Sequence, residues 1–293
     1  MNQQPLTQRD LEVVLDLYKY RYLKTSQIQQ LYFPSLQTTN RRLRSLAEQK
    51  LVKHFQVPNV PERIYHISQR GASLVANQLG VTAEDLNWSK NTRAPKDYYF
   101  MQHFLGINQF RIDLNQACQN SPVELLGFIP EYFGAKHLSG RITKHIKDFV
   151  FDARNPRDKI THTPDAVFAL QRDDKPALFF LEIDRGTEVL TNPSKGFLKM
   201  TRYYINYAKE RKFKSYEQEF NCSQLHLFRL LIITTSEQRL NNMRQAATRH
   251  HSSSANVLRY FWLTTFDKVS VETMWYDIWL SLDKSDHAMY AVA

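Results

Sequence analysis

The chain has 293 residues, 42% of them hydrophobic, and a formal net charge of +10. This content excludes a disordered chain, and the length allows one large domain or two ordinary ones. The basic surplus favours a polyanionic partner, either nucleic acid or an acidic membrane surface. No apolar run approaches the roughly 20 residues of a membrane span, the N-terminus lacks a signal-peptide pattern, and the two Cys suggest neither zinc nor disulfides. We therefore expect a cytoplasmic bacterial protein with no membrane partner.

Three helices are predicted in the first fifty residues. Thr7 and Asp10 make an acceptable start for the first helix, because apolar residues follow at helical spacing. A second short helix fits residues 25–31, and a third runs from about Leu36 to Gln49. On the third helix the Leu side chains share one face. The residues that point largely the other way are Thr38, Arg41, Arg42 and Ser45.

Two strands and a fourth helix follow. The strands are expected at residues 51–55 and 63–67, and the helix begins near Ser68. Helix, helix, helix, hairpin, helix is the order of a winged helix-turn-helix. The segments Asn40–Leu46 and Leu51–Lys53 resemble the recognition helix and the wing entry of that family.

The predicted third helix is strongly basic. From Leu36 to His54 there are five Lys and Arg against a single acid, Glu48. A helix fits the major groove, where Arg side chains read guanine edges or anchor phosphates. The alternative is a solvated basic helix in a winged helix that binds protein. The residues expected to contact double-stranded DNA are Thr38, Arg41, Arg42, Arg44, Ser45, Lys53 and Arg63.

The chain is expected to divide into two domains. Residues 81–96 lose hydrophobic periodicity and precede a predicted buried helix, so they are interpreted as a linker between residues 1–80 and 97–293. In the second domain the predicted order is α-β-β-β-α-β, with a polar excursion at 134–161. The elements expected are a helix at 97–117, strands at 123–129, 166–170 and 177–183, a helix at 194–208, a strand at 227–234, a helix at 236–250 and a last strand at 257–264.

Acidic residues stand at the ends of two of these strands. Asp165 follows Thr163-Pro164 at the start of one strand, and Glu182 and Asp184 end the next. Glu182 and Asp184 are two residues apart, so a strand points both to the same face. Carboxylates that converge in this way can hold Mg²⁺ or Mn²⁺.

This pattern resembles the acidic core of the PD-(D/E)XK nuclease superfamily, with the αβββαβ order of its fold. The expected fold class is therefore α+β, a winged helix-turn-helix followed by an α/β restriction-endonuclease-like domain. One position departs from the family: Asp184 stands where Lys is usual, giving E-x-D in place of (D/E)-x-K. If the site is catalytic, the resemblance implies a metal held by Asp165, Glu182 and Asp184; otherwise no cofactor is expected.

A replacement cation is expected on the following helix. Lys195, Lys199, Arg202 and Asn206 are spaced 4, 3 and 4, which places them on one helix face. Of these, Lys199 and Arg202 are the candidate catalytic cations. The alternatives are a solvated helix face, and acids retained in an inactive fold where they pair with Lys199 or Arg202. His162 alternates out of phase with Asp165 and is not expected on the acidic face.

The combination of a winged helix with Pro164-Asp165 and the run Leu181–Glu188 resembles the replication-relaxation family of plasmids, phages and other mobile elements. The resemblance implies a DNA-binding protein that regulates replication, mobilisation or transcription, associated with nucleoid or plasmid. The alternative is an Mg²⁺- or Mn²⁺-dependent DNA endonuclease targeted by its winged helix; a toxin-like nuclease acting on RNA is a third reading. A palindromic target would imply a homodimer, but no heptad repeat predicts one.

Overall fold

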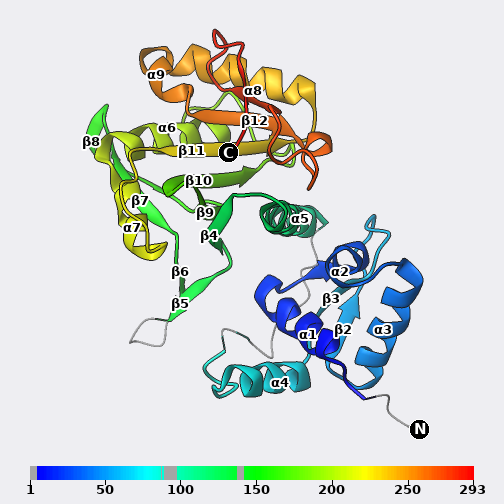
Figure 1. Ribbon diagram of the computed structural model, residues 1–293. Helices are drawn as coiled ribbons and strands as arrows, with labels where there is room; N and C mark the ends of the chain where they lie inside the picture. The colour runs from blue at the N-terminus through cyan, green and yellow to red at the C-terminus, as the bar shows by residue number, and fades with distance from the viewer. Residues whose placement is uncertain (1–4, 87, 89–97, 137–141) are drawn as a thin grey trace. The chain divides into compact units, whose positions relative to one another are not determined.

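The computed structural model describes residues 5–86, 88, 98–136 and 142–293 and shows an α+β protein (Figure 1). The chain forms two compact units, Met1–Ile112 and Asp113–Ala293. The division falls inside a helix, α5 (Tyr98–Gln119). Most of the predicted linker, residues 87 and 89–96, lies outside the described residues. No helix in the described part of the chain is long and apolar enough to cross a membrane.

The N-terminal unit contains the predicted helices and hairpin. Its elements are α1 (Gln8–Tyr20), β1 (Leu23–Lys24), α2 (Thr25–Tyr32), α3 (Leu36–Glu48), β2 (Val52–Phe55), β3 (Ile64–Ile67) and α4 (Gln69–Leu79). The three strands pair antiparallel in the order β1-β3-β2. The predicted elements of this part of the chain are confirmed to within about two residues at each end.

Local caps explain where these helices begin. The side chain of Thr7 accepts a hydrogen bond from the backbone of Asp10, whose carboxylate in turn accepts from Thr7, which forms a capping box. Ser35 caps α3 and Ser68 caps α4 by accepting from the backbone N–H groups of Thr38 and Gly71. Gly71 is required near the start of α4, because a Cβ there would lie 2.2 Å from the carbonyl oxygen of Leu51.

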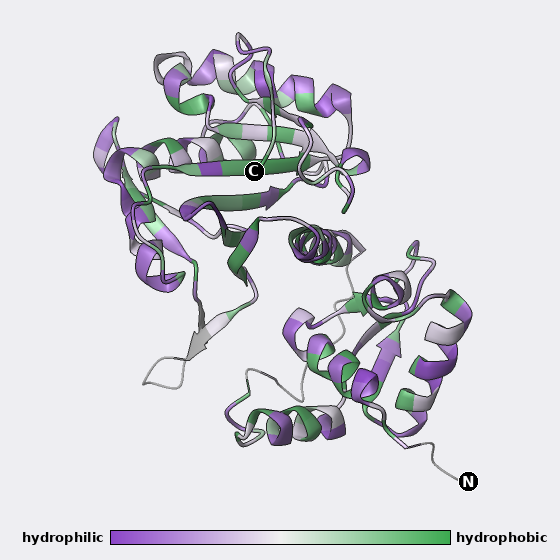
Figure 2. Ribbon diagram, viewed as in Figure 1, coloured by the Kyte–Doolittle hydropathy of each residue, from purple (hydrophilic) through white to green (hydrophobic). Residues whose placement is uncertain are grey.

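One apolar cluster fills the N-terminal unit. Val14 and Leu17 of α1 pack with Ile28 of α2, Leu43 of α3 and Val75 of α4, and all five are essentially inaccessible to water. Each comes from the apolar face that helical spacing predicts. Figure 2 shows the consequence on α3, where hydrophobic and hydrophilic bands alternate.

The first part of α5 belongs to the N-terminal unit by its contacts. The buried amide of Asn108 donates to the carbonyl oxygens of Tyr20 and Tyr22, at 3.0 and 2.7 Å. Gln27 of α2 donates to the carbonyl of Leu105 at 3.0 Å. These bonds satisfy polar groups that would otherwise be buried at a cost.

The C-terminal unit is built on a seven-stranded mixed sheet with the order β14-β13-β12-β11-β10-β9-β4. The strands are β4 (Glu124–Pro130), β9 (Ala166–Arg172), β10 (Lys175–Ile183), β11 (Phe228–Thr234), β12 (Phe261–Thr265), β13 (Trp279–Ser281) and β14 (Met289–Tyr290). Strands β10, β11 and β12 run parallel to one another, and the other pairs are antiparallel. Figure 2 shows β10 and β11 as largely hydrophobic, as central strands should be.

Two hairpins occupy the predicted polar excursion: β5 (Gly134–Lys136) pairs with β6 (Ile142–Lys144), and β7 (Asp148–Asp152) pairs with β8 (Asn155–His162). The helical elements that follow are α6 (Gly196–Glu210), η1 (Lys212–Ser215), α7 (Tyr216–Glu219), α8 (Glu237–His250), η2 (Ser252–Ser254), α9 (Ala255–Leu258) and η3 (Phe266–Lys268). Helices α6 and α8 pack against each other and bury one face of the sheet.

Two predictions for the end of the chain were wrong. The last strand was expected from residue 257, but residues 255–258 form α9 and β12 begins only at Phe261. Strands β13 and β14 were not predicted, because runs of two or three residues are too short to show an alternating pattern.

Candidate functional site

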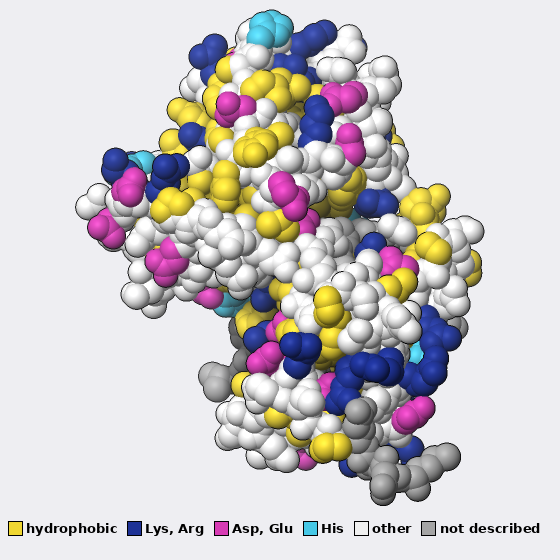
Figure 3. All heavy atoms as spheres, turned by 45° about the vertical axis from the view of Figure 1, so that its right-hand side comes forward, with side chains coloured by type: hydrophobic (Ala, Val, Ile, Leu, Met, Phe, Trp, Pro, Cys, Tyr) yellow, Lys and Arg dark blue, Asp and Glu magenta, His cyan; other side chains and the backbone are white. Residues whose placement is uncertain are grey.

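Two groups of charged residues stand out, one in each unit. The first is the outer face of α3. Arg41 and Arg44 are exposed, and within the described part of the chain neither side chain has a hydrogen-bond or ion-pair partner. Lys53 on β2 and Arg63 just before β3 are also exposed, and their side chains have no such partner among the described residues. Figure 3 shows Lys and Arg gathered on the side of the N-terminal unit that carries α3.

The two hydroxyl residues predicted on this face are half-buried and serve α3 itself. Thr38 accepts a hydrogen bond from the N-cap residue Ser35 at 3.0 Å. Ser45 accepts from Gln49, the C-cap residue, at 3.4 Å. Both lie at the edge of the exposed stripe rather than at its centre.

Arg42, adjacent to Arg41, has a different environment. Its Nε lies 2.6 Å from Oδ1 of Asp10, and its Nη2 contacts the other carboxylate oxygen. The Asp10 side chain is 1% exposed and that of Arg42 is 12% exposed. Burial alone would raise the pKa of Asp10, but the hydrogen bonds from Arg42 and Thr7 outweigh it and lower that pKa. Arg42 therefore holds α3 against α1.

A groove of about 570 Å³ runs beside the exposed face of α3. Asn40 and Arg44 line it from α3, and Glu62 and Arg63 line it from the segment before β3. Glu62 is anchored, because its carboxylate accepts from the backbone and the hydroxyl of Ser26 at 2.7 and 3.1 Å. Asn40, missed among the predicted contacts, is exposed and lies one helical turn before Arg44.

The second group surrounds the acids at the end of β10. Asp165, immediately before β9, is 8% exposed. Its Oδ2 accepts from the backbone N–H of Ile183 at 2.6 Å, and its own N–H donates to the carbonyl of Leu181 at 3.1 Å. Asp165 thus extends the pairing of β9 with β10 to the end of the strand.

Glu182 is held by two ring-bearing side chains. Its Oε1 lies 2.6 Å from Nε2 of His162 and accepts from the hydroxyl of Tyr204 at 2.6 Å. Burial raises the pKa of Glu182, and the nearby charge of Asp165 adds to this rise. Burial alone would lower the pKa of His162, but the charge of Glu182 outweighs it and raises that pKa. The expectation that His162 faces away was wrong: β8 ends at His162, and Pro164 interrupts the alternation before Asp165.

Asp184 forms a bidentate ion pair, here called the fork, with Arg239 of α8. Its Oδ2 accepts from Nε of Arg239 at 2.5 Å and from the hydroxyl of Thr234 at 2.5 Å, and its Oδ1 accepts from Nη2 of Arg239 at 2.8 Å. The hydrogen bond to Asp184 raises the pKa of Arg239. The same guanidinium donates to the carbonyl of Glu188 at 2.9 Å. The cation that pairs with Asp184 is therefore Arg239 of α8, and not a residue of α6 as expected.

Glu188 joins Asp165, Glu182 and Asp184, because these acids lie close enough for the charge of one to raise the pKa of another. Partial burial raises the pKa of Glu188, and the carboxylates of Asp184 and Asp165 raise it further. Glu182 accepts from Tyr204 of α6, and Asp184 accepts from Arg239 of α8. Both helices pack on one face of the sheet, so the two acids point to the same face, as strand alternation predicts.

The cations predicted from α6 lie elsewhere. Arg202 Nη1 is 3.4 Å from Oδ2 of Asp152 at the end of β7, and Asn206 accepts from the backbone of Ala153 at 3.3 Å. Lys199 is half-buried, and within the described residues its side chain has no hydrogen-bond or ion-pair partner. The predicted stripe therefore serves mainly the β7–β8 hairpin, and neither cation pairs with the three predicted acids.

A metal held by all three predicted carboxylates does not fit this arrangement. Both oxygens of Asp184 are engaged by Arg239, and the described residues contain no group of three or more His, Cys, Asp or Glu suited to hold an ion. Mg²⁺ and Mn²⁺ require oxygen ligands with lone pairs directed at the ion. Asp184 meets that requirement least, because its charge is already neutralised.

His162 was expected to lie off the acidic face, and Tyr204, Thr234 and Arg239 were not predicted as members of this site. His162 carried a usable signal, since it stands three residues before Asp165 at a strand end. Arg239 carried none, because it lies 55 residues from Asp184 and only the packing of α8 brings the two together.

Comparisons with known proteins bear on both units. No curated protein and no solved structure matches the chain. A family model described as replication-relaxation matches residues 15–221, more than two thirds of the sequence. The match includes α3 and the acids Asp165, Glu182 and Asp184, and it ends before Arg239. The chain belongs to the replication-relaxation family.

Proposed function

We propose that this protein binds double-stranded DNA and regulates replication, mobilisation or transcription of a plasmid, phage or other mobile element. Family membership supports the link to replication and mobile elements. In this proposal residues 1–80 form a winged helix-turn-helix that carries the DNA contacts. Residues 97–293 form a PD-(D/E)XK-like domain, and residues 81–96 link the two.

The observation that carries the proposal is the exposed basic face of α3. Arg41 and Arg44 project from one side of a helix whose opposite side is buried, and they are not neutralised by any described neighbour. Desolvating an arginine is costly unless it gains a new partner, and DNA phosphates or guanine edges provide one. The direct contacts in this proposal are Asn40, Arg41, Arg44, Lys53 and Arg63.

The half-buried Thr38 and Ser45 flank this surface and are suited to phosphate contacts through their hydroxyls. Arg42 is not included, because its guanidinium is committed to Asp10. The groove beside α3 gives Arg44 and Arg63 a common space, so one DNA backbone can meet both.

Binding of a pool of random-sequence duplexes by the Arg41→Ala/Arg44→Ala double variant tests this proposal. We expect weaker binding and a flatter salt dependence: each lost phosphate contact reduces the slope of log K against log salt by about 0.9. Arg70→Ala removes another exposed arginine, from α4 of the same unit, and should bind nearly normally. Unchanged binding by the double variant would mean that α3 does not contact DNA.

A second candidate is a metal-dependent DNA endonuclease. One observation favours it: Asp165 lies close enough to Glu182 for its charge to raise the pKa of that carboxyl. The fork between Asp184 and Arg239 speaks against it, because it removes the third carboxylate. The remaining expected cations, Lys199 and Arg202, are not paired with these acids.

Incubation with supercoiled plasmid and Mg²⁺ or Mn²⁺ separates the two candidates, with EDTA as the control. For a regulator we expect DNA binding without nicking. Metal-dependent nicking that is lost in Asp165→Ala would instead establish the nuclease. Arg239→Ala adds a further arm, because nicking that appears only in this variant would show that the fork keeps the site inactive.

A further inference from the structure

The C-terminal unit contains a cavity lined by aromatic, aliphatic and basic residues. It encloses about 380 Å³ beside the starts of β11 and β12, where α6 ends. Its floor is aromatic, formed by Phe213, Phe228 and Phe261, which are nearly inaccessible to water. Leu227 and Tyr260, at 37% and 41% exposed, form its accessible apolar walls. The volume lies within the range of small-ligand sites.

The charged side chains that line this cavity are all basic. Lys209 and Arg211, at the end of α6, and His226, before β11, are exposed there, and no acid lines it. Within the described part of the chain Lys209 and Arg211 have no ion-pair partner. The neighbouring acid Glu210 is engaged elsewhere, since it accepts from the backbone of Phe151 at 2.9 Å and lies 3.9 Å from Lys212. The cavity therefore combines an apolar floor with a rim suited to an anion.

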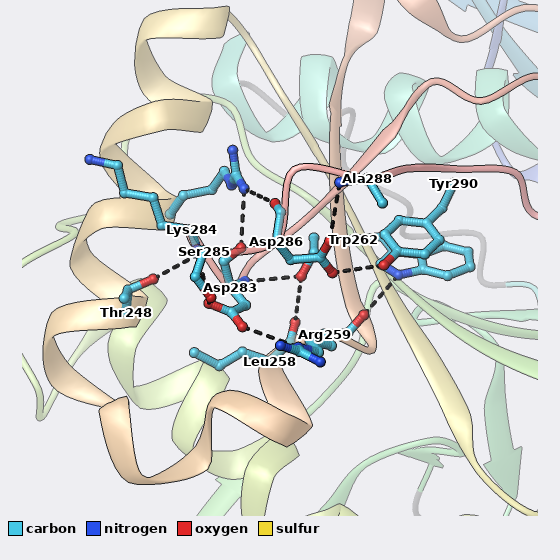
Figure 4. Close-up of polar contacts among 12 residues, drawn as sticks. Thr248, Leu258, Arg259, Trp262, Asp283, Lys284, Ser285, Asp286, Ala288 and Tyr290 are labelled. Atoms are coloured by element: carbon cyan, nitrogen blue, oxygen red, sulfur yellow. Dashed lines mark hydrogen bonds and ion pairs between the residues drawn. The ribbon is translucent and has the colours of Figure 1, made fainter.

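Tyr260 is the end member of a row of stacked groups. The guanidinium of Arg229 lies 4.7 Å from the ring centre of Tyr260 and 4.9 Å from that of Trp262. Trp262 in turn stacks on Tyr290, with ring centres 4.9 Å apart and planes 11° apart, and Figure 4 shows these two rings together. Hydrogen bonds fix the far end of the row: the hydroxyl of Tyr290 donates to Asp286 at 2.7 Å, and the indole of Trp262 donates to the carbonyl of Arg259 at 3.0 Å.

This row holds an exposed aromatic ring in place at the edge of a basic cavity. Arg229 stacks on the Tyr260 ring, whereas Tyr260 and not Arg229 lines the cavity. Tyr260 is 41% exposed and lines the cavity, and an exposed aromatic ring can stack on a nucleobase of any kind. A phosphate attached to that base could then reach Lys209 and Arg211.

We propose that this cavity binds an unpaired nucleotide of single-stranded DNA, with the base on Tyr260 and the backbone phosphate at Lys209 and Arg211. Duplex DNA does not fit the site, because its bases are stacked on one another and cannot enter. The inference does not depend on the duplex contacts proposed for α3. It adds a second nucleic-acid surface that prefers melted DNA.

The test is binding of fluorescein-labelled oligothymidylate, which remains unpaired, to the full chain. Tyr260→Ala should weaken binding by about 5- to 140-fold, the range for loss of one base–aromatic stack. Tyr260→Phe keeps the ring and should bind normally, whereas Tyr260→Leu keeps apolar bulk without the ring and should behave like Tyr260→Ala. Lys209→Ala/Arg211→Ala should reduce the slope of log K against log salt by up to about 1.4, which is about 0.7 for each phosphate contact with a single strand.

Two controls assign the effect to this cavity. Arg249→Ala/Lys284→Ala removes two other exposed cations of the same unit and should leave binding of the single strand unchanged. Arg41→Ala/Arg44→Ala should weaken duplex binding without weakening oligothymidylate binding.

Equal binding by Tyr260→Ala and Tyr260→Phe would overturn the proposal. So would displacement of the oligonucleotide by a fatty acid, since that would make the cavity an acyl site. Binding of thymidine monophosphate as tight as that of the oligomer would overturn the assignment to a strand.

Discussion

The outer face of α3 and the acid cluster at the end of β10 use charge in opposite ways. On α3 the guanidinium groups of Arg41 and Arg44 face water and remain unpaired by described neighbours. At the end of β10, Glu182 and Asp184 are enclosed by the donors of His162 and Arg239. Exposed unpaired charges are available to a partner, whereas buried charges must be neutralised within the fold. The acid cluster is therefore arranged mainly for stability, whereas the outer face of α3 keeps the charges on which the proposed DNA binding rests.

Arg42 shows that this contrast holds between adjacent residues. Arg41 and Arg42 have the same chemistry and stand side by side on α3, yet only Arg42 meets a buried carboxylate. Helical geometry turns neighbours about 100° apart, so one faces water while the next faces α1.

The largest effect is expected from breaking that buried pair. Asp10→Ala removes the carboxylate that neutralises the half-buried guanidinium of Arg42 and removes the capping box of α1, so we expect it to destabilise the N-terminal unit by about 3–5 kcal/mol. Hydrogen exchange of peptides from α1 and α3 measures this loss separately from the C-terminal unit. Glu12→Ala removes an exposed acid from the same helix and should cost less than about 0.5 kcal/mol. Similar costs for the two variants would contradict a structural role for Asp10.

A somewhat smaller effect is expected from opening the fork in the C-terminal unit. Arg239→Ala removes the cation from Asp184 and should cost about 2–3 kcal/mol, less than the Asp10 variant, because Asp184 keeps the hydrogen bond from Thr234 and no helix cap is lost. Urea unfolding of Arg239→Ala, Asp184→Ala and the double variant gives their coupling energy. Arg249→Ala on the same helix is the matched control. Additive losses would show that the fork contributes nothing to stability, and the contrast with α3 would fail.

A change of pH is expected to have the smallest effect on the free energy of unfolding. A rise in pH stabilises the N-terminal unit through Asp10 and destabilises the C-terminal unit through His162. The lowered pKa of Asp10 contributes to the stability of the folded N-terminal unit. This contribution is fully present above pH 3.8, the ordinary pKa of an aspartate, and it is lost as the pH falls through the lower pKa of the folded state. The raised pKa of His162 gives stability that is complete below 6.5 and is lost as pH rises through the folded-state value. The raised pKa of Glu182 acts in the same direction as that of His162, beginning at its ordinary value of 4.5.

Thermal unfolding of the C-terminal unit on either side of pH 6.5 measures the His162 contribution. One titrating proton changes stability by at most about 1.4 kcal/mol per pH unit. His162→Gln still donates to Glu182 but does not titrate, so it should lose the part of the slope that begins near 6.5. If the variant keeps the same slope, another group must cause it.

Most helices and strands of this protein were predictable from local signals. Thr7, Ser35 and Ser68 mark helix starts by bonding to the backbone within the same turn, and the apolar run of β10 marks a buried strand. The strands that were not predicted lack such local signals. Strands β13 and β14 have two or three residues each, and they exist because neighbouring strands pair with them.

The composition of the candidate acid site was only partly predictable. The sequence resemblance identified Asp165, Glu182 and Asp184, and the structure brings them into one neighbourhood. The partners were not predictable, since His162 lies 20 residues from Glu182 and Arg239 lies 55 residues from Asp184. The predicted cation Arg202 was a reasonable choice by helical spacing, but Asp152 engages it instead.

The sequence by itself determined where helices and strands form, because caps, spacing and hydrophobic periodicity act within a few residues. It also determined the family, through residues 15–221. Only the tertiary structure decided which charges remain available. Ion pairs depend on distances of a few ångströms between groups far apart in the chain, so Arg41 and Arg42, nearly equivalent in sequence, acquire different environments only when α1 packs against α3.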